Sequence, residues 1–290
     1  MKDAEENQWY SWYTSFDQTY GPQKRRQWYS SVAEAYSWAR PHYPDALVEG
    51  VIDQARLAMP SDYQSSILEI GCGPGIATAA FAARGIAVQG VEPSPAACEL
   101  ARQRCGTYEG VQIANATFEE WPLGAQTFDA VLAATSFHWV SPAVACKKSA
   151  AALKPDGSLI LLWATPPQPS PEICQHLRSV YERYSLSALG EEQCRTQSYY
   201  QKNFETFAQI VNDSGFFQTS SVKIEAHHSI YSIKKYLTLL STLSGYIALE
   251  ETTRTDLLSA LGAALAKRLD GNELTTEHWF AAQVSPLASR

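Results

Sequence analysis

Residues 67–92 read ILEIGCGPGIATAAFAARGIAVQGVE, and this stretch decides the fold. It opens with a short, mainly apolar run that has the length and composition of a buried strand. The glycine-rich turn Gly71–Gly75 follows, and an alanine-rich helix is expected over Ile76–Arg84. A second strand is expected over Ala87–Val91, and it leads into Glu92. A strand, a glycine turn, a helix and a second strand in this order predict a parallel sheet whose first turn binds a nucleotide-like cofactor.

Strands and helices continue to alternate through the rest of the chain. Strands are expected over 66–70, 87–91, 111–114, 128–134, 158–163, 222–230 and 277–284, and helices over 45–58, 76–84, 95–104, 142–153, 204–213, 233–243 and 255–269. Lys154–Gly157 predicts a turn before the fifth strand. Short apolar strands that alternate with helices predict an α/β fold, in which helices cover both faces of a mostly parallel sheet.

The glycine turn favours one type of cofactor over another through its spacing and through the acid before it. A dinucleotide site carries G-x-G-x-x-G, whereas Gly71, Gly73 and Gly75 form G-x-G-x-G. A carboxylate at Glu69 suits a cationic ligand and would repel a pyrophosphate. Glu92 can accept hydrogen bonds from both hydroxyls of a ribose, a role that both kinds of site share. The pattern favours S-adenosylmethionine, and a nicotinamide-dependent oxidoreductase is the main alternative among enzymes.

Residues 67–163 resemble the core of class I S-adenosylmethionine-dependent methyltransferases of the small-molecule type. The resemblance implies a Rossmann-like, seven-stranded, mostly parallel sheet whose last strand is antiparallel. It also implies that Glu69 and the glycine turn hold the methionine part of the cofactor, Glu92 the ribose, and the turn Asn115–Phe118 the adenine. Many relatives carry Asp where Asn115 stands, so this position departs from the family pattern. The implied cofactor-binding residues are Tyr36, Arg40, Glu69, Gly71, Gly73, Gly75, Glu92, Pro93, Ser94, Asn115, Ala116, Thr117 and Phe118.

The segment Ala35–Pro44 resembles the tyrosine- and arginine-bearing approach helix of many of these methyltransferases. The resemblance implies that Tyr36 and Arg40 lie over the methionine end of the cofactor, with Arg40 near its carboxylate. An ordinary helix end, packed by proline, is the other interpretation of this segment.

The segment Ser136–Val140 follows the fourth strand, where the carboxyl end of the strand faces the cofactor's methyl group. His138 and Trp139 are therefore candidates for binding the methyl acceptor, and His138 is the candidate catalytic residue. Relatives with Trp at this place include methyltransferases that act on carboxylic acids, such as the trans-aconitate type. His138 could donate to an acceptor carboxylate, take a proton from an amine or hydroxyl, or be a structural histidine. Carboxylate O-methylation is the first hypothesis; N-, C- or phenol O-methylation and a non-catalytic cofactor-binding protein are the alternatives.

Eleven aromatic residues lie between Gln8 and Tyr43, and so much aromatic area predicts a segment that packs over the core. Trp28 and Tyr29 are candidates for lining the acceptor site. The predicted organisation is a single domain with a cap: 1–45 as an aromatic N-terminal cap segment, 46–165 as the cofactor-binding core, and 166–290 as the rest of the core. Insertions at about 166–202 and 232–270 would complete the helical cap and enclose a small-molecule acceptor.

The composition bounds the possible partners of this 290-residue chain. Its net charge of −7 disfavours nucleic acid as a substrate, because phosphate contacts need a basic face. No apolar run is long enough to span a bilayer, and the polar segment Met1–Asn7 does not resemble a signal peptide, so a cytoplasmic location is expected. The six cysteines show no metal-ligand spacing and predict free, mostly buried thiols and no bound metal. A monomer or a homodimer is expected.

Overall fold

The computed structural model of the chain describes residues 27, 29–57, 63–124 and 127–289. Trp28 and most of the aromatic N-terminal stretch lie outside the described residues. The acceptor-binding role of Trp28 therefore stays a prediction.

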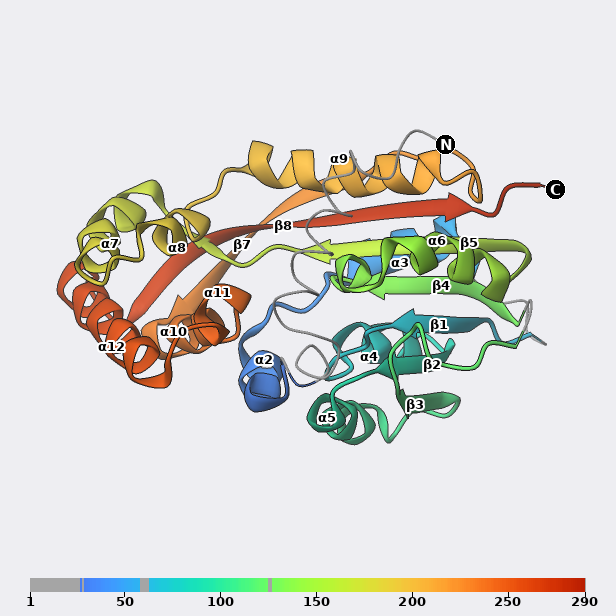
Figure 1. Ribbon diagram of the computed structural model, residues 1–290, viewed down its shortest axis with the longest axis horizontal. Helices are drawn as coiled ribbons and strands as arrows, with labels where there is room; N and C mark the ends of the chain where they lie inside the picture. Colours follow the sequence, from blue (N-terminus) through green and yellow to red (C-terminus); the bar gives the residue numbers. More distant parts are fainter. Residues whose placement is uncertain (1–26, 28, 58–62, 125–126, 290) are drawn as a thin grey trace.

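Within the described residues, eight strands form one sheet in the order β3-β2-β1-β4-β5-β8-β6, and β7 pairs with β8 (Figure 1). The strands are β1 Ser66–Ile70, β2 Ala87–Glu92, β3 Val111–Asn115, β4 Phe128–Ala134, β5 Leu153–Ala164, β6 Gln168–Pro169, β7 Lys223–Ser232 and β8 Glu273–Pro286. Neighbouring strands from β3 to β5 are parallel, and β8 runs antiparallel to β5. The predicted α/β fold and the antiparallel last strand are confirmed.

The strand count differs from the predicted seven because Gln168–Pro169 pairs with β8 opposite Glu277 and Thr276. Two residues are too few to show a hydrophobic period, so the sequence does not indicate this strand. The predicted turn Lys154–Gly157 is also wrong, because these residues lie within β5. The pairing shifts register there, and four residues of β5 lie opposite one residue of β4. The turn-forming residues therefore produce an irregularity inside a strand and do not end it.

Helices cover both faces of the sheet, and β1 is buried on both. The helices on the two faces of the sheet are α3 Asp45–Gln54, α4 Ile76–Ala82, α5 Pro95–Cys105, α6 Pro142–Ala152 and α9 Gln197–Asp213. Ile67 packs with the buried side chains of α3 and α4, while Leu68 and Ile70 pack with those of α6 and α9. Because neighbouring residues of a strand face opposite sides, Glu69 points to the α4 face together with Ile67.

A second group of helices lies beyond the carboxyl ends of the parallel strands, at the left of Figure 1. Its members are α7 Pro171–Arg183, α8 Ser187–Glu192, α10 Ile233–Ser241, α11 Ser244–Ile247 and α12 Glu251–Arg268. They share a hydrophobic cluster that also contains Ala39, at the end of α2 Ala33–Ala39. We call this group the cap. Its helices come from the two predicted insertions, while the division of the chain at residues 45 and 165 stays a prediction.

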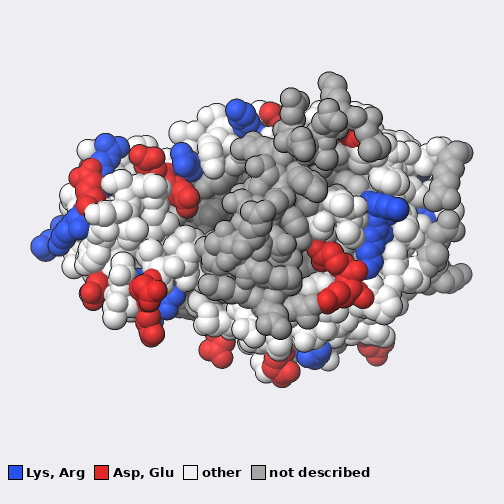
Figure 2. Space-filling view, in the orientation of Figure 1, with Lys and Arg blue, Asp and Glu red and all other residues white. Residues whose placement is uncertain are grey.

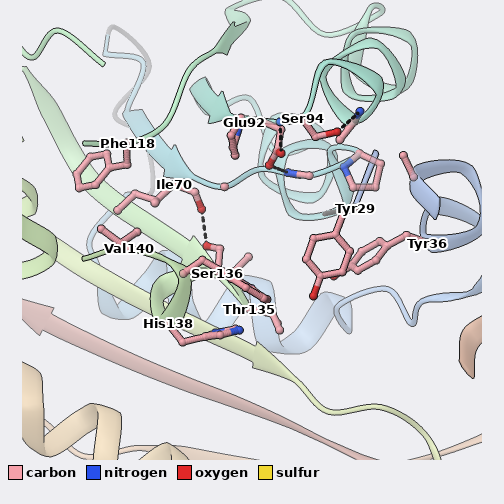
Figure 3. Close-up of a pocket in the computed structure, with 18 of the residues that line it drawn as sticks. Tyr29, Tyr36, Ile70, Glu92, Ser94, Phe118, Thr135, Ser136, His138 and Val140 are labelled. Atoms are coloured by element: carbon pink, nitrogen blue, oxygen red, sulfur yellow. Dashed lines mark hydrogen bonds between the residues drawn. The ribbon is translucent and has the colours of Figure 1, made fainter. Parts of the chain in front are cut away.

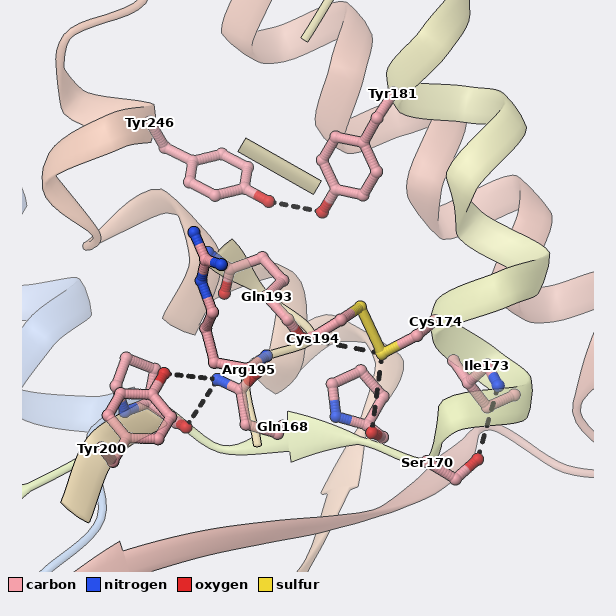
Figure 4. Close-up of a disulfide and its surroundings, with 12 residues drawn as sticks. Gln168, Ser170, Ile173, Cys174, Tyr181, Gln193, Cys194, Arg195, Tyr200 and Tyr246 are labelled. Atoms are coloured by element: carbon pink, nitrogen blue, oxygen red, sulfur yellow. Dashed lines mark hydrogen bonds between the residues drawn. A yellow bond between two sulfur atoms is a disulfide. The ribbon is translucent and has the colours of Figure 1, made fainter. Parts of the chain in front are cut away.

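A disulfide joins Cys174 of α7 to Cys194, which follows α8 (Figure 4). The prediction of free thiols is therefore wrong for this pair and correct for the other four cysteines, which are buried and free. The bonded residues are 20 apart in sequence with 5.9 Å between their Cα atoms. The packing of α8 against α7 brings the two cysteines together, and no local sequence motif indicates that packing.

On the face shown in Figure 2, the acidic and basic side chains of the described residues are interspersed. None of the helices in the described ranges has the length and apolarity that a membrane crossing requires. Among these same residues, no three or more His, Cys, Asp or Glu side chains lie together so that they could hold a metal ion.

Candidate cofactor and acceptor site

A cavity of about 430 Å³ lies at the carboxyl ends of β1, β2 and β4, between the core and the cap (Figure 3). Its walls come from the turn after β1, the residues after β2, the segment before α2, the 3-10 helix η3 Phe137–Trp139, and α11. A smaller recess of about 50 Å³ opens beside it and shares Tyr36, Arg40 and Gly73 with it. The position is the one that parallel α/β sheets use for ligands.

The three glycines of the turn have positive φ angles of 62°, 54° and 78°, which favour glycine over residues with a side chain. A Cβ on Gly71 would lie 2.8 Å from the Cβ of Ser136, and one on Gly75 would lie 3.1 Å from the Cα of Ala101 in α5. A Cβ on Gly73 would meet no described atom within 4 Å, and Gly73 lines the cavity. Gly73 therefore gives a ligand close access to the backbone, Gly71 lets Ser136 approach the turn, and Gly75 lets α4 and α5 approach each other.

Glu92 joins the glycine turn to the end of β2. Its carboxylate accepts hydrogen bonds from the backbone N–H of Gly73 at 3.0 Å and of Ser94 at 2.8 Å. The side chain is 8% exposed and lines the cavity, and burial raises its pKa. Two backbone donors fix the carboxylate in place, so that its remaining lone pairs face the cavity as ready acceptors.

Glu69 lines the recess and not the main cavity. It is 1% exposed, and the hydroxyl of Thr78 donates to its carboxyl group at 2.6 Å. Burial raises the pKa of Glu69 to about 8, against a smaller opposing effect of the Thr78 hydrogen bond. The carboxyl is therefore neutral at pH 7 in this state, and a cation beside it would favour its ionised form.

The turn predicted to hold adenine divides into two parts. Thr117 and Phe118 line the cavity, whereas Asn115 and Ala116 do not. The side-chain amide of Asn115 donates to the backbone carbonyls of Glu92 at 2.9 Å and Pro93 at 3.0 Å. Asn115 thus holds the segment after β2 in position, and its contact with the adenine stays a prediction.

Arg40 and Tyr36 line both the cavity and the recess, and their role at the methionine end of the cofactor stays a prediction. Arg40 donates from Nε to the hydroxyl of Thr242 at 3.0 Å and from Nη2 to its carbonyl at 3.1 Å. The guanidinium carbon lies 4.6 Å from the centre of the Tyr36 ring. These contacts tie the end of α2 to the residue that follows α10, so Arg40 connects the cavity wall to the cap.

His138 and Trp139 both line the cavity from η3. The His138 ring stacks on Trp163 with 5.7 Å between ring centres, and burial lowers its pKa to about 4. The imidazole is therefore neutral at pH 7. Trp139 meets Tyr29 edge-on at 5.7 Å, and the hydroxyl of Tyr29 shares a hydrogen bond with that of Ser244 in α11 at 3.0 Å.

Several lining residues were not predicted from the sequence. Thr135, which has a φ of 54°, and Ser136 follow β4 directly, and the rule that selected His138 could have found them. Ser136 donates to the backbone carbonyl of Ile70 and so fixes the turn after β1. Tyr43 shares a hydrogen bond with Thr135 at 3.0 Å in the recess. Ser244 lies in an insertion without any motif, and no sequence signal identifies it.

The core of the chain is similar in sequence to a known family of protein domains. Residues 68–161 match a family model described as a methyltransferase domain. The match identifies this segment as a methyltransferase domain. An uncharacterized methyltransferase of Mycobacterium tuberculosis (strain ATCC 25618 / H37Rv) is 33% identical over 137 residues, which are 47% of this chain and 52% of that protein. The demethylmenaquinone methyltransferase of Tropheryma whipplei (strain Twist) is 29% identical over 126 residues, 43% of this chain and 51% of that one.

The chain therefore spans about half the length of these relatives. Among solved structures, a protein assigned as a type II methyltransferase from Anaeromyxobacter dehalogenans superposes with a TM-score of 0.57 and 19% identity. That match covers 85% of this chain and 97% of the other. The likeness shows that the methyltransferase fold extends well beyond residues 68–161.

Proposed function

We propose that this protein transfers a methyl group from S-adenosylmethionine to a small-molecule acceptor bound in the cavity. The observation that carries the proposal is the buried Glu92 carboxylate, fixed by the N–H of Gly73 and aimed into the cavity of a methyltransferase domain. Such an acceptor pair suits the two hydroxyls of a ribose.

The residues present fit the rest of the cofactor as well. The recess with Glu69, Tyr36 and Arg40 suits the amino and carboxylate groups of a methionine part, since it offers both an acid and a guanidinium. Thr117 and Phe118 offer a polar and an apolar surface to the adenine. When bound, S-adenosylmethionine supplies a methyl group attached to a positively charged sulfur. The chain itself contributes orientation and the exclusion of water, which are the main demands of a direct displacement.

The acceptor would lie between η3, the segment before α2 and α11. This space is covered by the cap, which favours a small molecule over a macromolecule. A carboxylate acceptor is supported by the position of Trp139, the feature that the sequence shares with methyltransferases of carboxylic acids. An amine acceptor is supported by the neutral state of His138, because an uncharged imidazole can accept a hydrogen bond from an amine. Nucleic acid is disfavoured by the net charge of −7.

Isothermal titration calorimetry with S-adenosylmethionine, S-adenosylhomocysteine and NAD tests the cofactor. The two adenosyl compounds are expected to bind and NAD is not, whereas binding of NAD alone would refute the proposal. Turnover of cofactor labelled in the methyl group, with a panel of candidate acceptors, then separates an enzyme from a protein that only binds the cofactor.

A further inference from the structure

We propose that the acceptor is an amine on an apolar scaffold, and that Tyr29 and Trp139, with Tyr36 packed behind Tyr29, form an aromatic cage around its nitrogen. This inference rests on the proposed function, because it names the substrate class of the same cavity. It makes the protein an N-methyltransferase for small apolar amines.

The rings of the cage meet at steep angles. Tyr29 lies 5.8 Å from Tyr36 with 75° between the ring planes, and 5.7 Å from Trp139 with 89° between the planes. All three line the cavity, and Figure 3 shows Tyr29 and Tyr36 side by side at one end of it. Aromatic rings that turn their faces toward a common corner are the arrangement by which proteins bind alkylammonium groups, because the ring face carries the negative part of the quadrupole.

The cage is held in place from both sides. The Tyr29 hydroxyl bonds to Ser244 of the cap, and the neighbouring Ser30 bonds to Ser94 of the core at 2.8 Å between hydroxyl oxygens. Rings fixed in this way lose little freedom when a ligand enters, so their contact area contributes to affinity.

The charges around the cavity argue against an anionic acceptor. Among the described residues that line it, Arg40 is the one Lys or Arg, and Thr242 already holds its guanidinium. The proposed function also directs Arg40 toward the carboxylate of the cofactor. Three carboxyl side chains line the same cavity: Glu92, Glu119 and Glu120. A carboxylate acceptor would enter without a free cation to receive it.

The charge changes of amine methylation suit these surroundings. The nitrogen lone pair forms a bond to the methyl carbon while the carbon–sulfur bond breaks and leaves its electron pair on sulfur. The products are S-adenosylhomocysteine and a methylammonium ion, which passes its proton to solvent after release. One positive charge moves from sulfur to nitrogen, and the rings and acids of the cavity stabilise it at both ends of the step.

A hydroxyl acceptor would demand more of the site, because its oxygen must lose a proton to become a good nucleophile. His138 is the near base, and its pKa of about 4 makes it a weak one. An amine that is protonated at pH 7 first passes its proton to solvent, and the uncharged amine then attacks with its own lone pair, so the transfer itself needs no base in the site.

Matched acceptors on shared scaffolds test the substrate class. The naphthylmethyl, benzyl and cyclohexylmethyl amines would each be compared with the corresponding alcohol and carboxylate, with 2-naphthol as the phenol, using labelled S-adenosylmethionine. At least one amine is expected to be methylated with kcat/KM about tenfold or more above its matched alcohol and acid. Preference for a carboxylate or a phenol overturns the inference, and so does binding of S-adenosylhomocysteine without methylation of any amine. Failure to bind S-adenosylhomocysteine would instead refute the proposed function.

Paired variants test the cage without relying on turnover. Tyr29→Leu and Trp139→Leu remove a ring, whereas Tyr29→Phe and Trp139→Phe keep an aromatic ring at the same place. Binding of benzyltrimethylammonium to protein saturated with S-adenosylhomocysteine is expected to weaken about tenfold in the Leu variants and less than about threefold in the Phe variants. Equal losses in both pairs contradict the cage. Weaker binding of S-adenosylmethionine with unchanged binding of the ammonium ion also contradicts it, because the rings would then serve the sulfonium alone.

Discussion

The side of the cavity that we assign to the cofactor is held by a contact between residues close in sequence. The side that we assign to the acceptor is held by a contact between residues far apart in sequence. On the cofactor side, Gly73 and Glu92 are 19 residues apart and belong to one strand–helix–strand unit. On the acceptor side, Tyr29 reaches Ser244 across 215 residues. A local motif is sufficient to specify the first contact. The second exists only because an N-terminal segment and a distant insertion pack against each other over the core.

Removal of the Glu92 carboxylate is expected to have the largest effect, and it falls on the cofactor side. Glu92→Ala should weaken S-adenosylhomocysteine binding about a thousandfold, since two hydrogen bonds to a buried carboxylate contribute about 2 kcal/mol each. Calorimetry measures the change, and Glu99→Ala on the exposed side of α5 is the matched control. An affinity within tenfold of the unmodified protein would show that the ribose lies elsewhere.

Loss of the disulfide should instead affect the cap. Replacing Cys174 and Cys194 together by Ser is expected to lower the free energy of unfolding by about 3 kcal/mol, because the bond closes a loop of intermediate length. Urea denaturation followed by fluorescence measures this, and the unmodified protein with a thiol reductant provides an independent comparison. Binding of S-adenosylhomocysteine should change less than about twofold. A large loss of cofactor affinity would mean that the two sides are not independent.

The titration of Glu69 gives the cofactor side a pH signature. Its pKa of about 8 lies above the value of 4.5 for an unfolded chain, so between these values the folded protein keeps a proton that the unfolded chain has released. The group therefore stabilises the folded state at low pH, and this contribution is lost as the pH rises through 8. A bound ammonium group favours the ionised form, so binding should release a proton below pH 8. Affinity for S-adenosylhomocysteine should therefore rise between pH 6 and 8, by at most about tenfold per pH unit.

Glu69→Gln is the matched variant for this pH dependence. It cannot ionise, so the slope attributed to Glu69 should disappear from both the binding and the stability profiles. Calorimetry in buffers of different ionisation enthalpy measures the released proton directly. A slope that persists in Glu69→Gln would assign the titration to another group.

The smallest expected effect concerns the contact between Arg40 and the cap. Thr242→Val keeps the shape of the buried side chain but leaves Arg40 Nε without its acceptor, which is expected to cost about 1–2 kcal/mol of stability. The apparent affinity for the acceptor should fall more than that for the cofactor, because the change loosens the cap. Thr238→Val, at a half-buried position of α10 where the hydroxyl donates to the backbone carbonyl of Lys234, is the control. Equal losses for both ligands would contradict the separation of the two sides.

The same comparison explains what the sequence predicted well. The helices and strands from Ser66 to Ala152 lie within a few residues of their predicted bounds, because each has its own periodicity and its own turn. The lining positions of Gly73, Glu92 and His138 follow from one rule, that ligands lie at the carboxyl ends of parallel strands.

Other features depend on tertiary surroundings and could not be predicted. Burial makes Glu69 neutral at pH 7, although its identity alone suggested a carboxylate. The side-chain amide of Asn115 donates to two backbone carbonyls after β2, and its place in the sequence does not indicate these contacts. The Cys174–Cys194 bond depends on the packing of two cap helices. In each case the neighbours of the residue in space, and not its type or its place in the sequence, decide what its side chain does.

A crystal structure with S-adenosylhomocysteine bound tests the central claim most directly. We predict that both ribose hydroxyls lie within hydrogen-bond distance of Glu92, that the adenine lies against Phe118, and that the sulfur points toward the space between Tyr29 and Trp139. A cofactor bound outside this cavity, or one whose sulfur points away from these two rings, would contradict the account.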